Sequence, residues 1–244
     1  MTASTRSRNR VGFTLVELIV VLMILVGLAA VLIPAVTDMV ARTNASTASS
    51  NISEVANAIQ RYETQFLSYP NDMDGLMTDL TGTQLDTLTT ALDTATEDVT
   101  LTAATLATLN EAGIENVGIH TAGDNTFVAP TSTALTDTTV LKGPTAATQV
   151  ALGLELTGTS GKYVLFGIGA NCDLNGKTSI DAPVYFPENG TLNPDLVYGR
   201  FLAVFQITDG TDALNRAKFV TVITPTGEGL STGMSNYFEI ATNQ

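Results

Sequence analysis

The sequence predicts an α+β protein in which a long N-terminal helix, half transmembrane and half amphipathic, packs on the antiparallel β-sheet of a C-terminal head. Three observations predict this class. Residues 13–36 form an almost uninterrupted apolar run. Apolar residues then recur at helical spacing between Ile52 and Phe66. Short β-branched and aromatic runs, separated by turn residues, follow in the C-terminal part of the chain.

The apolar run covers 24 residues, from Phe13 to Val36, and within it only Thr14 and Glu17 carry polar side chains. A helix of this length spans about 36 Å, which is enough to cross the hydrocarbon core of a bilayer. Pro34 lacks a backbone N–H and should kink or loosen the helix locally. We therefore predict a membrane-spanning segment over residues 13–36.

The segment before the apolar run, residues 1–12, contains three arginines and no acidic residue. Basic flanks are retained on the cytoplasmic side of a membrane. The sequence therefore predicts a single-pass membrane protein with its N-terminus in the cytoplasm and its C-terminal part on the other side of the membrane.

Residues 37–69 are expected to continue the helix as an amphipathic half. Apolar residues recur there at intervals of three, four, three and four, which places them on one helix face. They are Ile52, Val55, Ile59, Tyr62 and Phe66. Ser68 precedes Tyr69-Pro70, and a proline disfavours helical geometry in the residue before it, so the helix should end here.

Residues 70–244 are expected to form one globular head. A short helix is predicted over residues 101–112, with Gly113 ending it, and a strand over 117–120. The Thr- and Ala-rich stretch of about 81–148 is expected to be mostly a solvated, variable loop region. Three later runs are predicted to form consecutive antiparallel strands. They are residues 163–168, 202–207 and 219–223.

Charge and cysteine content narrow the function classes. Without the three leader arginines, 8 of the 11 basic residues remain against 24 acidic ones, a balance of about −16. Such a field repels phosphate, so general nucleic-acid binding is excluded. The single cysteine, Cys172, excludes an intramolecular disulfide.

The run from Gly12 through Phe13 to Glu17, after a short basic leader, resembles the processing site of type IV prepilins and type II secretion pseudopilins. The resemblance implies cleavage between Gly12 and Phe13 by a prepilin peptidase and N-methylation of Phe13. It also implies that Glu17 pairs with the N-terminal ammonium of a neighbouring subunit. Pro34 matches a family proline in the same helix. The competing interpretation of Glu17 is an acid that reaches water at the interface of an ordinary signal anchor.

A second, looser resemblance covers about 25 residues, in which a Tyr69-Pro70 turn and a Gly75-Leu76 step are similar to those of the major pseudopilin. Many type IV pilins close a C-terminal loop with a disulfide, which this chain cannot form. Both features favour a pseudopilin.

The resemblance implies a structural subunit of a periplasmic pseudopilus in a type II secretion-like system, and not an enzyme. It also implies that the subunit is inserted in the bacterial inner membrane with its head in the periplasm. Its expected partners are other copies of itself, other pilin-like subunits, a prepilin peptidase, an inner-membrane assembly platform and membrane lipid. Two alternatives stay open. One is a type IV pilin serving adhesion, twitching or DNA uptake, and the other is a signal-anchored periplasmic domain that does not polymerise.

Residues 173–181 contain two further patterns. Asn175-Gly176-Lys177-Thr178 lacks the earlier glycine of a phosphate-binding loop, so a hairpin turn is expected instead. The oxygen-bearing residues of the same stretch make a calcium site possible, because hard cations bind oxygen ligands. The central Lys177 opposes a cation, however, and favours a solvated turn. The candidate ligands are Asp173, Asn175, Ser179 and Asp181.

His120 is the only histidine and Cys172 the only cysteine. Their separation of 52 residues carries no spacing information for a nucleophile and its base, and no Gly-x-Ser-x-Gly motif accompanies them. Structural roles are predicted for both, and no cofactor is expected.

Overall fold

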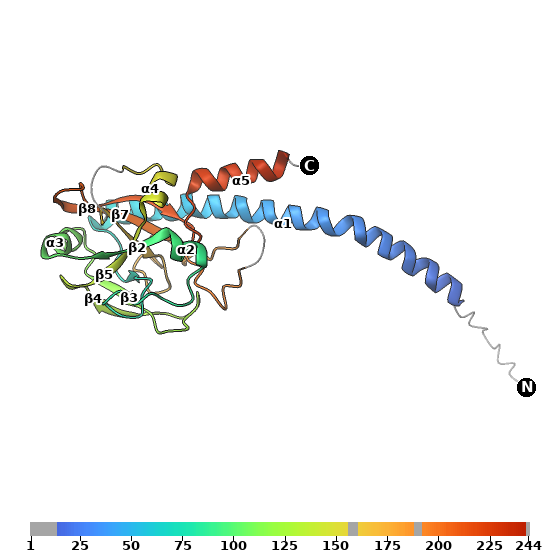
Figure 1. Ribbon diagram of the computed structural model, residues 1–244, viewed down its shortest axis with the longest axis horizontal. Coiled ribbons are helices and arrows are strands. Elements are labelled where there is room, and N and C mark those ends of the chain that lie inside the picture. Colours follow the sequence, from blue (N-terminus) through green and yellow to red (C-terminus); the bar gives the residue numbers. More distant parts are fainter. Residues whose placement is uncertain (1–13, 156–160, 188–191, 243–244) are drawn as a thin grey trace, which may run out of the picture. The chain divides into compact units, whose positions relative to one another are not determined.

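The computed structural model describes residues 14–155, 161–187 and 192–242 (Figure 1). It confirms the α+β class, with a long N-terminal apolar helix and a mixed sheet in the C-terminal part. Contacts divide the chain into two compact units, Met1–Val40 and Ala41–Gln244. The helix α1 (Leu15–Phe66) contributes to both.

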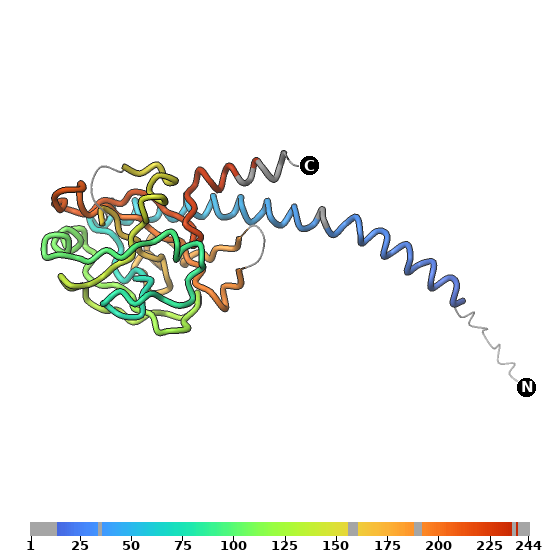
Figure 2. Tube along the Cα trace, in the orientation of Figure 1, coloured from blue at the N-terminus to red at the C-terminus, as the bar shows by residue number. Residues whose placement is uncertain are grey.

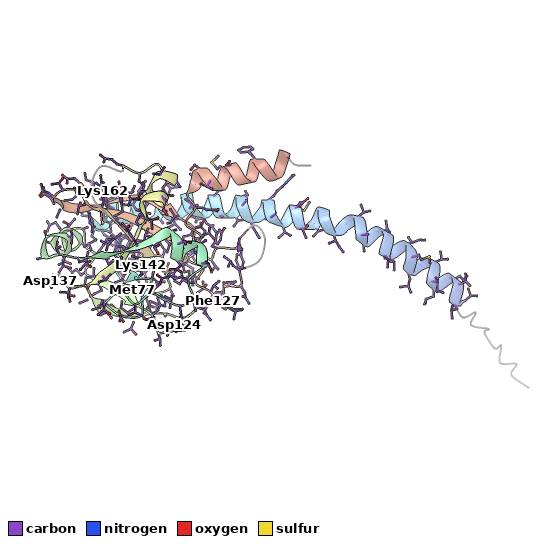
Figure 3. The ribbon with its side chains drawn as sticks, in the orientation of Figure 1. Met77, Asp124, Phe127, Asp137, Lys142 and Lys162 are labelled. Atoms are coloured by element: carbon purple, nitrogen blue, oxygen red, sulfur yellow. The ribbon has the colours of Figure 1, made fainter. Side chains whose placement is uncertain are left out.

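The first unit contains the apolar half of α1. Every large apolar side chain described between Leu15 and Val36 is exposed, from 41% at Ile19 to 75% at Val31. In Figure 3 side chains extend from both visible edges of this part of the ribbon. Among the described residues α1 is the one helix long and apolar enough to span a membrane. Because apolar groups surround the whole helix, its natural environment is lipid or another apolar helix.

The second unit contains the amphipathic half of α1. Ile52, Val55, Ile59 and Tyr62 are at most 4% exposed and belong to the main hydrophobic core. Phe66, predicted to share this face, is 48% exposed, because it lies at the end of the helix. The predicted helix end near residue 68 is confirmed to within two residues.

The head is built around a six-stranded sheet in the order β4-β3-β1-β6-β7-β8. Its strands are β1 (Met73–Asp74), β3 (Asn116–Ile119), β4 (Thr131–Ala134), β6 (Tyr163–Gly167), β7 (Leu202–Thr208) and β8 (Ala213–Ile223). The predicted antiparallel sheet is wrong in one respect, since β1 pairs with β3 in parallel. The long connection from residue 75 to residue 115 lets the chain return in the same direction.

Both faces of this sheet are buried. Along β6, Val164 and Phe166 belong to the core beneath α1, whereas Tyr163 and Leu165 belong to a second core. Residues 202–205 of β7 alternate in the same way. A strand covered on both faces has no reason to alternate apolar and polar residues, which explains the continuous apolar runs of β6 and β7.

The Thr- and Ala-rich stretch helps to cover the second face of the sheet. Leu85 and Leu92 are fully buried in the second core and Leu141 is fully buried in the main core, so the expectation of a mostly solvated loop region is wrong. The stretch contains α2 (Thr90–Ala95), β2 (Thr96–Thr100), α3 (Ala103–Glu111), β5 (Val140–Pro144) and α4 (Ala146–Ala151). Strands β2 and β5 pair with each other. The predicted short helix corresponds to α3, and Gly113 follows it with a φ of +87°.

The chain closes with a helix that the sequence pattern did not predict, α5 (Leu230–Thr242). It follows β8 and lies beside the Ser46–Ser53 part of α1 (Figure 2). The two helices approach closely at Gly233, where an added Cβ would lie 3.0 Å from Ser49 Oγ.

Candidate functional site

The first candidate site is the start of α1. Gly12 and Phe13, the predicted processing residues, lie outside the described residues. Thr14 and Glu17 are described and bind each other reciprocally. The Glu17 carboxylate accepts hydrogen bonds from Thr14 N at 2.8 Å and Thr14 Oγ1 at 3.0 Å, and Glu17 N donates to Thr14 Oγ1 at 3.3 Å.

This arrangement is a capping box, in which a Thr and a Glu three residues later satisfy backbone N–H groups at the helix start. It gives Glu17 a local role that the sequence interpretation did not include. Glu17 is nevertheless exposed, and no cationic group pairs with its carboxylate within the part of the chain that the structure describes. The carboxylate therefore remains accessible to a cation from another molecule.

Pro34 lies within α1, which continues without interruption on either side of it. Its side chain lies outside the described residues. The local kink stays a prediction.

The loop between β6 and β7 holds all four calcium candidates and supplies each with a partner, including Ser179 Oγ, which donates to the Asp181 carbonyl at 2.9 Å. Asp173 pairs with Lys177 Nζ at 3.1 Å. The Asn175 amide donates to the carbonyls of Gly169 and Ala170, and Asp181 accepts from the N–H of Ala182. No group of three or more His, Cys, Asp and Glu side chains that could hold a metal ion occurs among the described residues.

The same loop holds the amphipathic half of α1. Lys177 Nζ lies 3.2 Å from Tyr62 Oη and over the rings of Tyr62 and Phe66, at 5.3 and 5.5 Å from their centroids. Thr178 Oγ1 donates to the Ala58 carbonyl at 2.9 Å. The hydrogen bond to Tyr62 and the carboxylate of Asp173 both raise the pKa of Lys177. The Asn175-Gly176 turn therefore belongs to a loop that contacts α1 through Lys177 and Thr178, and we call these contacts the clasp. The predicted hairpin between paired strands is wrong.

A second candidate is a buried polar cluster that the sequence analysis missed. Asp74 on β1 accepts a hydrogen bond from Tyr198 Oη at 2.8 Å. His120 Nε2 lies 3.6 Å from Asp74 Oδ2, and His120 Nδ1 lies 3.7 Å from Asp124 Oδ2. Asp74, His120 and Tyr198 are at most 2% exposed. Figure 3 labels Asp124, the more exposed end of the cluster.

Glycines make room for this cluster. A Cβ at Gly169 would lie 2.1 Å from both carboxylate oxygens of Asp74, and one at Gly167 would overlap Tyr198 Oη. Burial raises the pKa of Tyr198 well above its ordinary value, and the Asp74 charge adds to the effect. Tyr198 therefore acts as a fixed hydrogen-bond donor. The closed environment suits a structural junction of three segments better than a site for a substrate.

Cys172 is buried, and its burial raises the pKa of the thiol to about 12. A thiol with such a pKa is neutral at physiological pH and is a weak nucleophile. The residue therefore offers no activated partner for His120.

Comparisons with known proteins give no match from which a role for either site could be transferred. No protein-family model matches the chain, and neither a curated protein nor a solved structure matches it.

Proposed function

We propose that this protein is a pilin-like structural subunit that is processed between Gly12 and Phe13, methylated at Phe13 and assembled into a periplasmic pseudopilus of a secretion system. One observation carries the proposal. Glu17 stands in the first turn of an apolar helix and has no cationic partner among the described residues. A carboxylate there is costly in lipid unless a cation approaches it.

The chemistry of processing would supply that cation. Cleavage before Phe13 creates an α-amino group, which stays protonated near neutral pH. Pairing this ammonium with Glu17 of a neighbouring copy would spare both charges from lying unpaired among apolar helices. Assembly would therefore be favoured only after processing.

The architecture is compatible with this function. A membrane-length apolar half can hold the subunit in the bilayer before assembly, while the other half of the same helix is anchored in the head by Ile59 and Tyr62. The apolar part of α1 would thus retain the subunit in the membrane, and the amphipathic part would connect it to the head. The absence of a second cysteine in the sequence favours a pseudopilin over a disulfide-closed pilin.

The first test is the mass of the N-terminal peptide of the membrane-extracted protein, from cells with and without the prepilin peptidase. We expect a chain beginning at N-methylated Phe13 only where the peptidase is present. A chain beginning at Met1 or Thr2 in both strains would instead indicate a signal-anchored domain.

The second test separates the capping role of Glu17 from its charge. Glu17→Gln keeps a side chain that can serve in a capping box but removes the charge, whereas Thr14→Ala removes the local partner and keeps the charge. We expect Glu17→Gln to insert into the membrane and to be largely lost from fibres. Thr14→Ala should assemble.

Fibre incorporation would be measured after shearing or crosslinking, with membrane-inserted subunit as the reference. Normal incorporation of Glu17→Gln would contradict the proposed charge pair. Loss of Thr14→Ala alone would assign Glu17 to capping.

A further inference from the structure

A groove of about 370 Å³ separates α5 from the amphipathic half of α1 within the second unit. One wall consists of serines spaced three and four residues apart on α1, and the other of apolar residues spaced four apart on α5. The groove is lined by Ser46, Ser49, Ser50, Ser53, Leu230, Met234 and Phe238.

The apolar wall is only partly covered. Leu230 is 37% exposed, Met234 49% and Phe238 61%, so exposure increases along α5 away from β8. Near its start the helix is held close to α1, at the contact between Gly233 and Ser49. The α5 stripe, defined as Leu230, Met234 and Phe238, therefore presents partly exposed hydrocarbon beside the serine-lined wall of α1.

The groove differs from the surface one turn further along α1, which is lined by Asn57, Gln60, Arg61, Thr64 and Gln65. That surface carries amides and a charge and suits water. The residues lining the α1–α5 groove include no charged side chain. Small residues let helix backbones approach closely. The hydroxyl of Ser53 donates to the Ser49 carbonyl at 3.1 Å, whereas the buried hydroxyl of Ser49 has no hydrogen-bond partner among the described residues. This wall therefore carries hydroxyl groups and no charge.

We propose that the α1–α5 groove receives the apolar half of α1, residues 18–33, from a second copy of this chain. The proposal rests on the proposed function, because a copy that leaves the bilayer must cover this half with protein. Residues 18–33 contain no charged side chain and include the small residues Gly27, Ala29 and Ala30. An added Cβ at Gly27 would meet nothing within 4 Å, so this side of the helix is open to a partner.

The chemistry favours this occupant over a polar partner. An uncharged helix matches a groove without charge, and its small residues can receive the side chains of Met234 and Phe238. Met side chains adapt to irregular apolar surfaces, so a single stripe can accept the varied Val, Leu and Ile residues of that helix. The groove would thereby extend the helix contacts of the fibre to the C-terminus of the chain.

The experiment places the photo-crosslinking residue p-benzoyl-phenylalanine at Met234 of the full-length protein, in cells that assemble fibres. The matched control carries it at Ser235, the next residue of α5, which is also exposed. We expect irradiated fibres to contain covalent dimers in which residue 234 is joined to residues 18–33 of another copy. The Ser235 control should give several-fold fewer of them.

A substitution tests the same contact without a probe. Met234→Gln should lower the share of subunit in fibres several-fold and leave Cys172 as protected from thiol reagents as in the unaltered chain. Ser235→Gln should change neither quantity.

The outcomes distinguish this inference from the proposed function. Fibres that form normally, with residue 234 joined to lipid, to its own chain or to another protein, would overturn the groove contact and leave the proposed function standing. A correctly expressed chain that forms no fibres would overturn both.

Discussion

The two halves of α1 have the same secondary structure and opposite surroundings. Ile24 in the first half is 57% exposed, and Ile59 in the second half is completely buried against the head. Both are isoleucines in the middle of one helix. The difference arises from what lies around each helical turn, and not from helix propensity.

Residue spacing explains this difference. In residues 18–33 apolar side chains occupy the whole circumference of the helix, so no single head could cover them. From Ile52 onward they occupy one face, and polar residues occupy the other. A helix of the second kind completes its own domain, whereas one of the first kind requires lipid or another apolar surface.

The largest expected effect comes from truncating one isoleucine in each half. Ile59→Ala should lower the free energy of unfolding of the head by about 2–5 kcal/mol, because it leaves a cavity in the core. Ile24→Ala should leave it unchanged, since that side chain contributes nothing to the head. Urea titration of the full chain in detergent micelles, with labelling of Cys172 as the readout, measures both, because this single buried thiol reacts only when the head opens. Equal losses in the two variants would contradict the division of α1.

The sequence predicted both halves of α1 and the main strands, because each has a clear period. It did not predict β1, since a strand of two residues, Met73 and Asp74, leaves no periodic signal. It also missed the second cover of the sheet, because the leucines that form it are isolated among threonines. The continuous apolar run of β6 could have indicated that cover, since a sheet with a solvated face alternates.

The local geometry at Glu17 was predictable from the sequence, whereas its role in assembly stays a prediction. Glu17 stands out against an apolar run, and a Thr-x-x-Glu pattern also indicates the observed capping box. The Asp74 cluster was not predictable, because its partners His120 and Tyr198 are brought together only by the sheet order. Side chains that are distant in the sequence and meet only in the folded sheet cannot be recognised as a cluster from a single sequence.

Alkaline pH should lower the free energy of unfolding of the head and leave the helicity of the apolar half of α1 unchanged. Burial raises the pKa of Cys172 from 9.0 to about 12 and that of Tyr198 above 10.0, so both are neutral in the folded head. The unfolded chain releases these protons at lower pH. The stabilisation is therefore complete below about pH 9 and is lost as the pH rises toward about 12.

Residues 14–40 contain no cysteine, tyrosine or lysine, so helicity in that half should stay constant over the same range. Near-ultraviolet circular dichroism during urea titration, from about pH 8 to about pH 10, follows the head. Cys172→Ala should reduce the loss of head stability at the start of this decline, as the pH first rises above about 9. An unchanged pH dependence in this variant would show that other groups cause it.

The smallest expected effect concerns the clasp between the β6–β7 loop and α1. Lys177→Met removes the contacts with Tyr62 and Asp173 and should lower the free energy of unfolding of the head by at most about 1 kcal/mol, because the ammonium is partly solvated. Lys218→Met on β8 is the matched control, since Lys218 is an exposed lysine outside the clasp. A loss at Lys177 that exceeds the loss at Lys218 would show that the amphipathic half is fixed partly by charge. Equal losses in the Lys177 and Lys218 variants would show that the amphipathic half of α1 is attached to the head by its apolar face alone. The contrast between the two halves of α1 would then arise from hydrophobic burial only.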